Sequence, residues 1–429
     1  MNISIAATKT PMGIMSSIMA ADSMFGRILF FAACLSVAAN GQTAAELKQQ
    51  ADARKASGDA AGALELVEKA AQADPNSAEL EDEIGFLLAV LKRNPEAKPH
   101  FERAVQLDPN YAAAHYHLGV LFWLEKDPNR AIPYLQTAIR LAPDVFDYHL
   151  KLGLAFFGVS HYQESVTELE TATRLDPGNS SAWNSLGLAL QQTGALRQAS
   201  DAYAKAVELN PADLTARNRY GFMLIQAREP EKALEQFRKV LDMDGANSEA
   251  MINIGLTYLK TGEFGKAEAE FRSVIQVDPG SAVGHYNLGL SLKQQDDLEA
   301  AKKEFLEAIR LDSDLPEAHY TLGMTLWQLG DFEETAKQMR AAIAQRPDYG
   351  EAHYLLGTVL KQSGDQEGAL KELRESARLL PEDPGPFNII GQILRVQGDL
   401  EGSKEAFAKG AAIKQKKEAE QAATLQQKK

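Results

Sequence analysis

Five histidines recur at one place in a repeating pattern, and histidine is both a common metal ligand and a common catalytic base. They are His115, His149, His285, His319 and His353. Along the sequence, consecutive histidines of this set are separated by the same number of residues as His115 and His149, or by a multiple of that number. Each histidine therefore belongs to a different repeat, and no two of them share a coordination shell. We therefore interpret these side chains as groups that pack between helices, and we predict no metal site.

Other residue patterns that carry catalysis are missing from the sequence. His117 lies two residues after His115, and side chains at that spacing point to different sides of a helix. There is no H-E-x-x-H zinc motif, no phosphate-binding G-x-x-x-x-G-K-[ST] loop and no G-x-S-x-G nucleophile motif. The single cysteine, Cys34, lies in an N-terminal apolar stretch, so a chain that has lost this stretch contains no thiol. We predict that the protein is not an enzyme and that it needs no cofactor.

The composition is that of a folded protein with an acidic surface. Charged residues make up 24% of the chain, apolar residues 45% and aromatic residues 7%, and the formal net charge is −14. An acidic surface repels phosphate groups, so we expect no nucleic-acid partner and no attachment to an anionic membrane surface. Many carboxylates, such as Asp108, Asp176 and Asp278, fall in predicted turns, where they favour turn and helix-cap geometry.

A glycine recurs at a constant interval, and this period organises most of the chain. All the intervals have the same length, with no insertion or deletion. The glycines are Gly85, Gly119, Gly153, Gly187, Gly221, Gly255, Gly289, Gly323, Gly357 and Gly391. One period before Gly85 stands Ala51, another small residue, which brings the predicted number of units to eleven. We number the positions of a unit so that this glycine is position 8.

Two further positions keep the same register. A small residue follows each glycine by twelve residues, as at Ala199, and a large apolar residue follows four residues later, as at Tyr203. These spacings predict two amphipathic helices in every unit, joined by a short polar turn. The small residues let the two helices approach closely. Proline closes most units, as at Pro211, because it lacks an N–H group and disfavours helix in the residue before it.

The unit from Ser180 to Asn210 shows the pattern most completely, with Trp183, Leu186, Gly187, Ala199, Tyr203 and Ala206, followed by Pro211. This pattern resembles the tetratricopeptide repeat, in which W-x2-L-G-x2-Y, A-x3-F, A and P recur in that order in every unit. The resemblance covers residues 44–410 and implies an all-α fold, an α-α superhelix or solenoid of about eleven helix-turn-helix units. The A-H-Y-x-L-G variant of the motif is similar to the arrays of O-linked N-acetylglucosamine transferases, but their catalytic domain has no counterpart in this sequence.

Residues 411–429 are rich in Lys, Glu, Gln and Ala. We predict a polar capping helix or tail there, since the end of a solenoid needs a polar face. The repeats and this tail leave no segment of a size to house a catalytic site, which supports the prediction that the chain is not an enzyme.

In tetratricopeptide arrays the first helix of each unit lines a concave groove, and the resemblance implies that positions 2, 5, 9, 12 and 13 point into it. The predicted partner-binding residues are Phe86, Tyr116, Val120, Trp123, Leu150, Leu154 and Phe157 in the N-terminal half, and Tyr286, Tyr320, Met324, Trp327 and Tyr354 in the C-terminal half. Aromatic residues on an exposed groove are typical anchors for a partner protein. The alternative is that some of them pack against the neighbouring repeat.

Two binding modes known in the family do not match these residues. Arrays that clamp the carboxylate of chaperone C-termini need Lys and Asn in three successive units, whereas Lys151 and Arg219 are isolated here. The asparagine ladder of the glycosyltransferase arrays occupies position 6, where the sequence has asparagine only at Asn253 and Asn287.

Residues 1–40 read as a leader. Residues 28–39 form an apolar stretch of twelve residues after Arg27, and Val37 and Ala39 suit the −3 and −1 sites of signal-peptide cleavage. We predict a signal peptide whose start is Met1 or Met24. The stretch is too short to span a bilayer, so we expect no integral membrane span in the mature chain. The alternative is a disordered leader or a membrane stub, and a lipid anchor on Cys34 fits the sequence less well because position −3 before the cysteine is Phe31 rather than a small residue.

Together these features predict an interaction scaffold or adaptor that binds a partner protein or peptide in the concave groove. The leader predicts export to the periplasm or cell envelope. Two alternatives stay open: a cytoplasmic adaptor, if the leader is not a signal peptide, and a non-catalytic subunit that presents substrates to a separate transferase or peptidase.

Overall fold

The computed structural model describes residues 42–427, which form 22 α-helices and no strand. This confirms the prediction of an all-α solenoid. The predicted signal peptide, both candidate start residues and Cys34 lie outside the described residues. Within the part of the chain that is described, no helix is both long enough and apolar enough to cross a membrane.

The helices form eleven consecutive pairs, one for each predicted unit. The first helices of the pairs are α2 (Ala44–Ala56), α4 (Ala78–Val90), α6 (Ala112–Leu124), α8 (Phe146–Gly158), α10 (Ser180–Gln192), α12 (Leu214–Gln226), α14 (Ser248–Thr261), α16 (Ala282–Gln294), α18 (Pro316–Leu329), α20 (Gly350–Gln362) and α22 (Pro384–Val396). The second helices are α3 (Ala60–Ala73), α5 (Asn94–Leu107), α7 (Pro128–Leu141), α9 (Tyr162–Leu175), α11 (Leu196–Leu209), α13 (Pro230–Met243), α15 (Phe264–Val277), α17 (Leu298–Leu311), α19 (Phe332–Gln345), α21 (Gln366–Leu379) and α23 (Leu400–Gln427).

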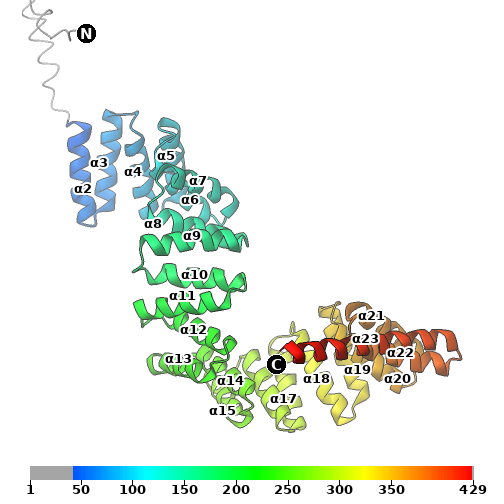
Figure 1. The fold of residues 1–429 in the computed structure, drawn as a ribbon. Coiled ribbons are helices and arrows are strands. Elements are labelled where there is room, and N and C mark those ends of the chain that lie inside the picture. Colours follow the sequence, from blue (N-terminus) through cyan, green and yellow to red (C-terminus); the bar gives the residue numbers. More distant parts are fainter. Residues whose placement is uncertain (1–41, 428–429) are drawn as a thin grey trace, which may run out of the picture. The chain divides into compact units, whose positions relative to one another are not determined.

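The chain divides into two compact units between Leu175 and Asp176. The first compact unit contains α2 to α9 and the second contains α10 to α23. Within each of them every helix packs against the next helix along the chain, which Figure 1 shows as a succession of helical hairpins. The unbroken period of the sequence does not predict this division.

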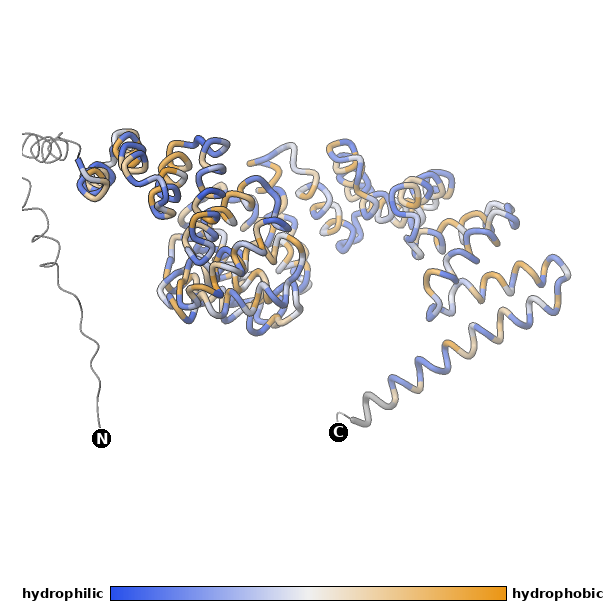
Figure 2. Tube along the Cα trace, turned by 90° about the horizontal axis from the view of Figure 1, so that it is seen from above, coloured by the Kyte–Doolittle hydropathy of each residue, from blue (hydrophilic) through white to orange (hydrophobic). Residues whose placement is uncertain are grey.

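The core lies between the two helices of a pair and between successive pairs. Its largest fully buried side chains include Phe101, Tyr203, Phe237, Phe271 and Phe305, all from position 24 of their units. Hydrophobic and hydrophilic stretches therefore alternate along most helices (Figure 2), because one face packs inward and the other meets solvent.

The glycine of position 8 makes room for the large residue of position 24. A Cβ atom added to Gly187 would lie 2.7 Å from the ring of Tyr203, and one added to Gly221 would lie 2.5 Å from the ring of Phe237. Real Cβ atoms do not approach so closely. The two helices of a pair therefore approach closely, as predicted, because the ring at position 24 packs directly against the backbone of the glycine at position 8.

Serine at position 20 has a specific partner in the core. The hydroxyl groups of Ser165 and Ser403 each donate a hydrogen bond of 2.8 Å to the carbonyl of the glycine in the first helix, Gly153 and Gly391 respectively. Both serines are almost fully buried. This bond explains how a polar residue replaces the usual alanine without leaving an unsatisfied group.

The turn inside each pair uses a left-handed residue at position 15. This residue is glycine in six units and has φ between 79° and 89°. In the other five units it is Lys92, Lys126, Ser160, Arg228 or Asp296, with φ of 61° to 63°. A side chain at such a φ costs about 1–2 kcal/mol, so the packing of the pair imposes this turn even where the sequence disfavours it.

Turn carboxylates act as the sequence predicts. Asp108, Asp176 and Asp278 accept hydrogen bonds from the backbone N–H groups two residues later, at 2.9 to 3.1 Å. Asp297 and Asp331 cap second helices by accepting an N–H three residues later. Each of these carboxylates satisfies a backbone donor that would otherwise be unpaired.

The C-terminal segment continues the last second helix. The helix α23 runs without a break from Leu400 to Gln427 (Figure 2), so most of the predicted capping segment is helical and belongs to this helix. Between Ala411 and Ala422 nearly all side chains are exposed, although Lys416 pairs with Glu382 at 3.1 Å. The segment is thus a polar extension of the helix beyond its contacts with α22.

Candidate functional site

Successive first helices touch one another in both compact units and so build up a surface. α4 contacts α6 and α6 contacts α8 in the first compact unit, while α12, α14 and α16 form one such series and α20 and α22 another in the second. We call the surface made by positions 2, 5, 9, 12 and 13 of the first helices the first-helix face. All twelve predicted partner-binding residues belong to it.

The predicted residues of the first compact unit keep exposed surface. Phe86 is 43% exposed, and the other six are half-buried: Tyr116, Val120, Trp123, Leu150, Leu154 and Phe157. Val90 and Leu124, at position 13 of α4 and α6, are 52% and 53% exposed. These two were not predicted, although position 13 in the register would have identified them. They extend the apolar surface to the C-terminal ends of the helices.

Some of these aromatic residues also join neighbouring repeats. Tyr116 of α6 stacks on Tyr148 of α8, with ring centroids 4.7 Å apart. Lys151 of α8 lies over the ring of Trp123, 5.2 Å from its centroid. Burial raises the pKa of Tyr116 well above its ordinary value. Tyr116 and Trp123 therefore pack against the next repeat, which is the alternative that the sequence left open for the groove residues. Part of each side chain nevertheless stays exposed.

A polar pair joins one repeat to the next beside the first-helix face. Nδ1 of His117 lies 2.9 Å from Oδ1 of Asp82, and Asp82 is 4% exposed. The ring of His117 also lies 5.5 Å from that of Phe86 and 5.4 Å from that of Phe101. The sequence analysis missed this pair.

The same contact recurs in the second compact unit. Arg219 donates to Asn184 at 2.9 Å, and the hydroxyls of Tyr286 and Thr321 lie 3.4 Å apart. In each case position 5 of one unit meets position 6 of the next, a spacing of 35 residues. That spacing is the signal by which such pairs could be found in a sequence.

The predicted residues of the second compact unit show the same mixture of roles. Trp327 is 42% exposed, while Tyr286, Tyr320, Met324 and Tyr354 are half-buried. Tyr320 lies against Tyr349 at the start of α20, with ring centroids 4.8 Å apart. Trp327 is therefore the predicted aromatic residue of this unit with the most surface for a partner.

The recurring histidines of position 4 form contacts within their own repeats. Nδ1 of His149 lies 2.6 Å from Glu168, nineteen residues later in the second helix, and Nε2 lies 2.7 Å from the carbonyl of Pro143, six residues earlier. His353 has the same two contacts, with Glu372 at 2.6 Å and Pro347 at 3.1 Å. Both rings are almost fully buried.

Other residues at position 4 use the same acceptors. The Nδ1 atoms of His285 and His319 lie 2.7 Å from Glu304 and Gln338, and Trp183 donates to the carbonyl of Pro177 at 3.0 Å. Position 4 is thus a structural bridge from the preceding turn to the second helix. Over residues 42–427 no three His, Cys, Asp or Glu side chains are placed to hold a metal ion.

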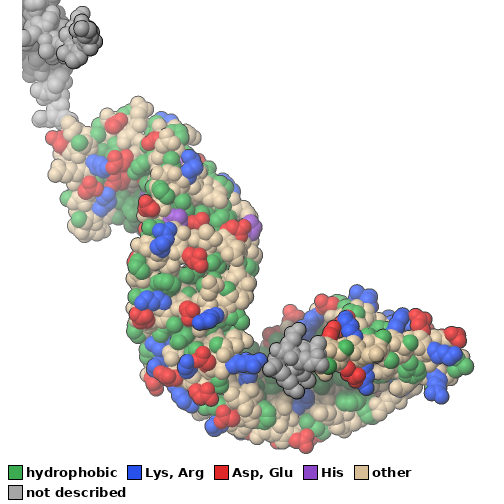
Figure 3. Space-filling view, in the orientation of Figure 1, with side chains coloured by type: hydrophobic (Ala, Val, Ile, Leu, Met, Phe, Trp, Pro, Cys, Tyr) green, Lys and Arg blue, Asp and Glu red, His purple; other side chains and the backbone are tan. Residues whose placement is uncertain are grey.

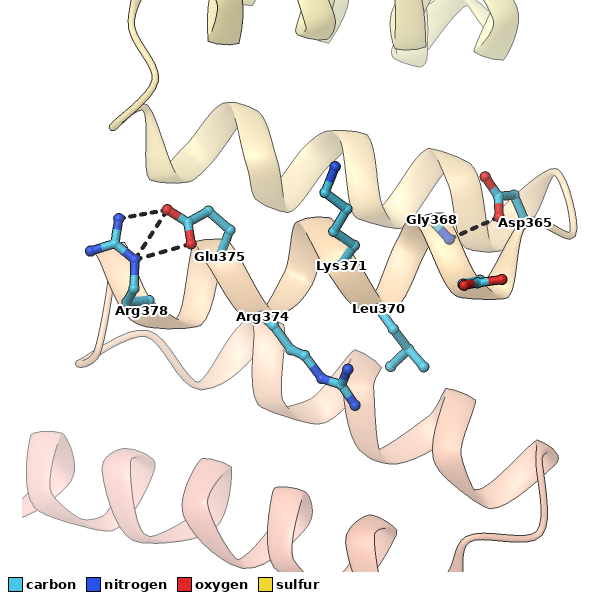
Figure 4. Close-up of a pocket in the computed structure, with 8 residues that line it drawn as sticks. Asp365, Gly368, Leu370, Lys371, Arg374, Glu375 and Arg378 are labelled. Atoms are coloured by element: carbon cyan, nitrogen blue, oxygen red, sulfur yellow. Dashed lines mark hydrogen bonds and ion pairs between the residues drawn. The ribbon is translucent and has the colours of Figure 1, made fainter.

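A hollow of about 840 Å³ lies against α21. Some of its charged groups are engaged locally: Arg378 donates to Glu375 at 3.0 Å, and Asp365 accepts the N–H of Gly368 at 2.8 Å. Figure 4 shows Lys371 on one side of the helix and Arg374 on the other. These side chains do not converge on one point, so the hollow does not make a binding site.

Acidic and basic side chains are interspersed on the surface seen in Figure 3, with apolar side chains between them. On the second helices some of this charge lies in nearby pairs along the helix, such as Lys205 with Glu208 at 2.8 Å and Lys239 with Glu235 at 2.6 Å. Exposed pairs of this kind contribute little stability.

Comparison with protein families identifies the repeat. A model described as tetratricopeptide repeat matches residues 87–146, 150–213, 190–250 and 320–384, which is more than half of the chain. Two further models, described as TPR repeat and tetratricopeptide repeat, match residues 291–330 and 224–286. The chain belongs to the tetratricopeptide repeat family. Proteins of this family are interaction scaffolds that bind protein or peptide partners, and the family is typically non-catalytic.

Several solved structures are similar in fold. Yeast Tom70 is 14% identical, with 90% of this chain and 96% of Tom70 covered and a TM-score of 0.47. A tetratricopeptide repeat protein from Parabacteroides merdae is 16% identical over 55% of this chain and 93% of that chain, with a TM-score of 0.46. YrrB, described as a TPR protein with an unusual peptide-binding site, is 24% identical over 44% of this chain and 96% of its own, with a TM-score of 0.37. No curated protein matches the chain.

Proposed function

We propose that the protein is a scaffold that holds a segment of another protein on its first-helix face and does not itself catalyse a reaction. The observation that carries this proposal is the exposure of large apolar side chains on the first-helix face of both compact units. Phe86, Val90 and Leu124 in the first compact unit and Trp327 in the second are each at least 42% exposed. Large apolar side chains that gather on one surface are typical of protein-interaction sites.

The test replaces the most exposed aromatic anchor of the second compact unit. Trp327→Ala removes a side chain from solvent rather than from the core, so the variant should fold with an unchanged circular-dichroism spectrum. Loss of an interface tryptophan costs about 2 kcal/mol or more of binding energy. We therefore expect partners recovered by crosslinking to wild-type protein to be depleted with Trp327→Ala, and with Trp123→Ala if they bind the first compact unit.

Leu306→Ala provides the matched control. Leu306 is 46% exposed but lies on the second helix α17, away from the first-helix face. An identical partner set for wild type, Trp123→Ala and Trp327→Ala would refute the proposal. If partners are lost only with Leu306→Ala, the binding site lies on the second helices instead.

We also propose that the scaffold works in the periplasm or cell envelope. The support is the leader pattern of residues 28–39, with Val37 and Ala39 at the cleavage positions. N-terminal sequencing of the protein from fractionated cells tests this. A mature chain that begins near residue 40 is expected in the envelope fraction, whereas a chain that keeps Met1 or Met24 in the cytosol would favour a cytoplasmic adaptor.

A further inference from the structure

The first helices α14 to α22 end in a row of cations interrupted by one tryptophan. Lys260, Lys293, Trp327, Lys361 and Arg395 occupy position 12 or 13 of five consecutive units and lie in the last turn of their helices. All five belong to the second compact unit. The negative end of the helix dipole favours a cation at a helix C-terminus, so lysine and arginine are tolerated there. The dipole does not, however, supply these side chains with a carboxylate partner.

The four cations of this row have no carboxylate partner among the described residues. Lys260 donates to the carbonyl of Ile225 at 3.2 Å, and Lys361 donates to the amide oxygen of Gln392 at 2.5 Å. Lys293 and Arg395 make no side-chain hydrogen bond or ion pair with any residue from 42 to 427. Burial lowers the pKa of Lys293, so its ammonium group is partly desolvated without compensation.

Some cations elsewhere in the chain are paired, while others, such as Lys303 and Arg374 on second helices, have no ion pair among the described residues. On the second helices of the same compact unit, Arg310 pairs with Glu307 and Arg378 with Glu375, and Lys337 pairs with Glu334. On the first helices of the first compact unit, Lys48 pairs with Glu79 and Lys55 with Glu83. What distinguishes the row is that its cations recur at the ends of consecutive first helices beside Trp327, so that several carboxylates of one ligand could meet them in a chain of net charge −14.

Several acidic residues near this edge are already engaged, whereas the carboxylate of the exposed Asp296, three residues after Lys293, has no hydrogen-bond or ion-pair partner among the described residues. Asp297, Asp331 and Asp365, in the turns that follow, accept backbone N–H groups as caps of the second helices. Glu317 lies at the opposite, N-terminal end of α18 and pairs with Arg346 at 2.7 Å. Beside the row, the half-buried rings of Tyr286, Tyr320 and Tyr354 and the exposed Trp327 form an apolar strip.

We propose that this edge recognises an extended, acidic segment of the partner protein that carries one apolar side chain for Trp327. The first helices α14 and α16, and likewise α20 and α22, are in contact, and packed helices lie about 8–10 Å apart. Because an extended chain rises about 3.3 Å per residue, carboxylates three residues apart would meet the two cations of each such pair. The inference rests on the proposed function and adds to it the charge and spacing of the ligand.

The experiment selects ligands without assuming a partner. The full chain is used to select from a displayed library of random peptides that are long enough to cross five first helices. We expect the selected peptides to be enriched in Asp and Glu at three-residue spacing around an apolar residue. A synthetic peptide of that sequence should bind the Lys293→Glu, Lys361→Glu double variant at least about tenfold more weakly than wild type.

The control variant reverses two charges away from the edge. Lys303→Glu with Lys371→Glu changes the net charge by the same amount on the exposed surfaces of second helices α17 and α21, and it should bind like wild type. Selected peptides without acidic enrichment, or equal binding by both double variants, would overturn the acidic-ligand inference while leaving the scaffold proposal standing. Failure to select any peptide whose binding depends on Trp123 or Trp327 would overturn both.

Discussion

At the residue scale, the packing of each helix pair depends most clearly on the absence of a Cβ atom at position 8. Gly187 and Tyr203 lie in the two helices of one pair, and the ring occupies the space that a Cβ atom of residue 187 would need. Tyr203 is fully buried, so neither the ring nor the backbone has free space into which to move. Packing rather than backbone flexibility therefore requires glycine at this place.

Gly187→Ala should destabilise the protein by about 1–3 kcal/mol, because the new methyl group would lie 2.7 Å from the Tyr203 ring. The midpoint of urea unfolding measures the change. Gly265→Ala is the control: it lies in α15 with its nearest neighbour 3.9 Å from the added Cβ, and alanine there should stabilise the helix by about 0.5–1 kcal/mol. Equal shifts for the two variants would contradict this account.

At the element scale, the position-4 bridge determines how a pair of helices is anchored to the preceding turn. His353 connects the carbonyl of Pro347 with Glu372 in α21, and the ring is 7% exposed. Tryptophan or arginine can serve at this position because each has a donor that reaches the same turn carbonyl. The residue type varies among units, while the bridge to the turn persists.

His353→Ala should destabilise the C-terminal repeats by about 1–3 kcal/mol, since it leaves the mostly buried Glu372 without its partner and removes the hydrogen bond to the carbonyl of Pro347. Hydrogen exchange of α20 and α21 would localise the effect. His161→Ala, at an exposed turn position, should change the stability by less than about 0.5 kcal/mol. A comparable loss at both sites would show that the bridge contributes nothing specific.

At the scale of the whole molecule, buried tyrosines make the array sensitive to alkaline pH. Burial raises the pKa of Tyr203 to about 12 and that of Tyr349 to about 12. In the unfolded chain a tyrosine releases its proton near pH 10. Between these values the unfolded state has lost protons that the folded state keeps, so the stability present below pH 10 falls as the pH rises toward 12.

Tyr203→Phe removes one of these groups. The variant loses the hydrogen bond between the Tyr203 hydroxyl and Gln191 at every pH, but its stability should fall less than that of wild type between about pH 9 and about pH 11. Urea midpoints at the two pH values give this difference. If both proteins lose the same stability over that interval, Tyr203 does not contribute to the alkaline sensitivity.

The repeat fold could be predicted in detail because each unit depends on local spacing. Gly187, Ala199 and Pro211 mark the contact, the small neighbour and the end of the second helix, and each acts within a single repeat unit. The groove positions follow from the same register, which is why the predicted aromatic residues all lie on the first helices with surface exposed. Whether a partner binds them stays a prediction.

What the sequence determined by itself is therefore the all-α repeat, the number of units and the exclusion of a shared histidine site, since periodicity alone decides which residues fall in one unit. The tertiary structure alone decided three other points. It paired Asp82 with His117 across repeats, separated the array at Leu175 and Asp176, and left Lys293 and Arg395 without carboxylates among the residues it describes. These depend on contacts between units, where a side chain's partner is set by helix packing rather than by its distance along the chain.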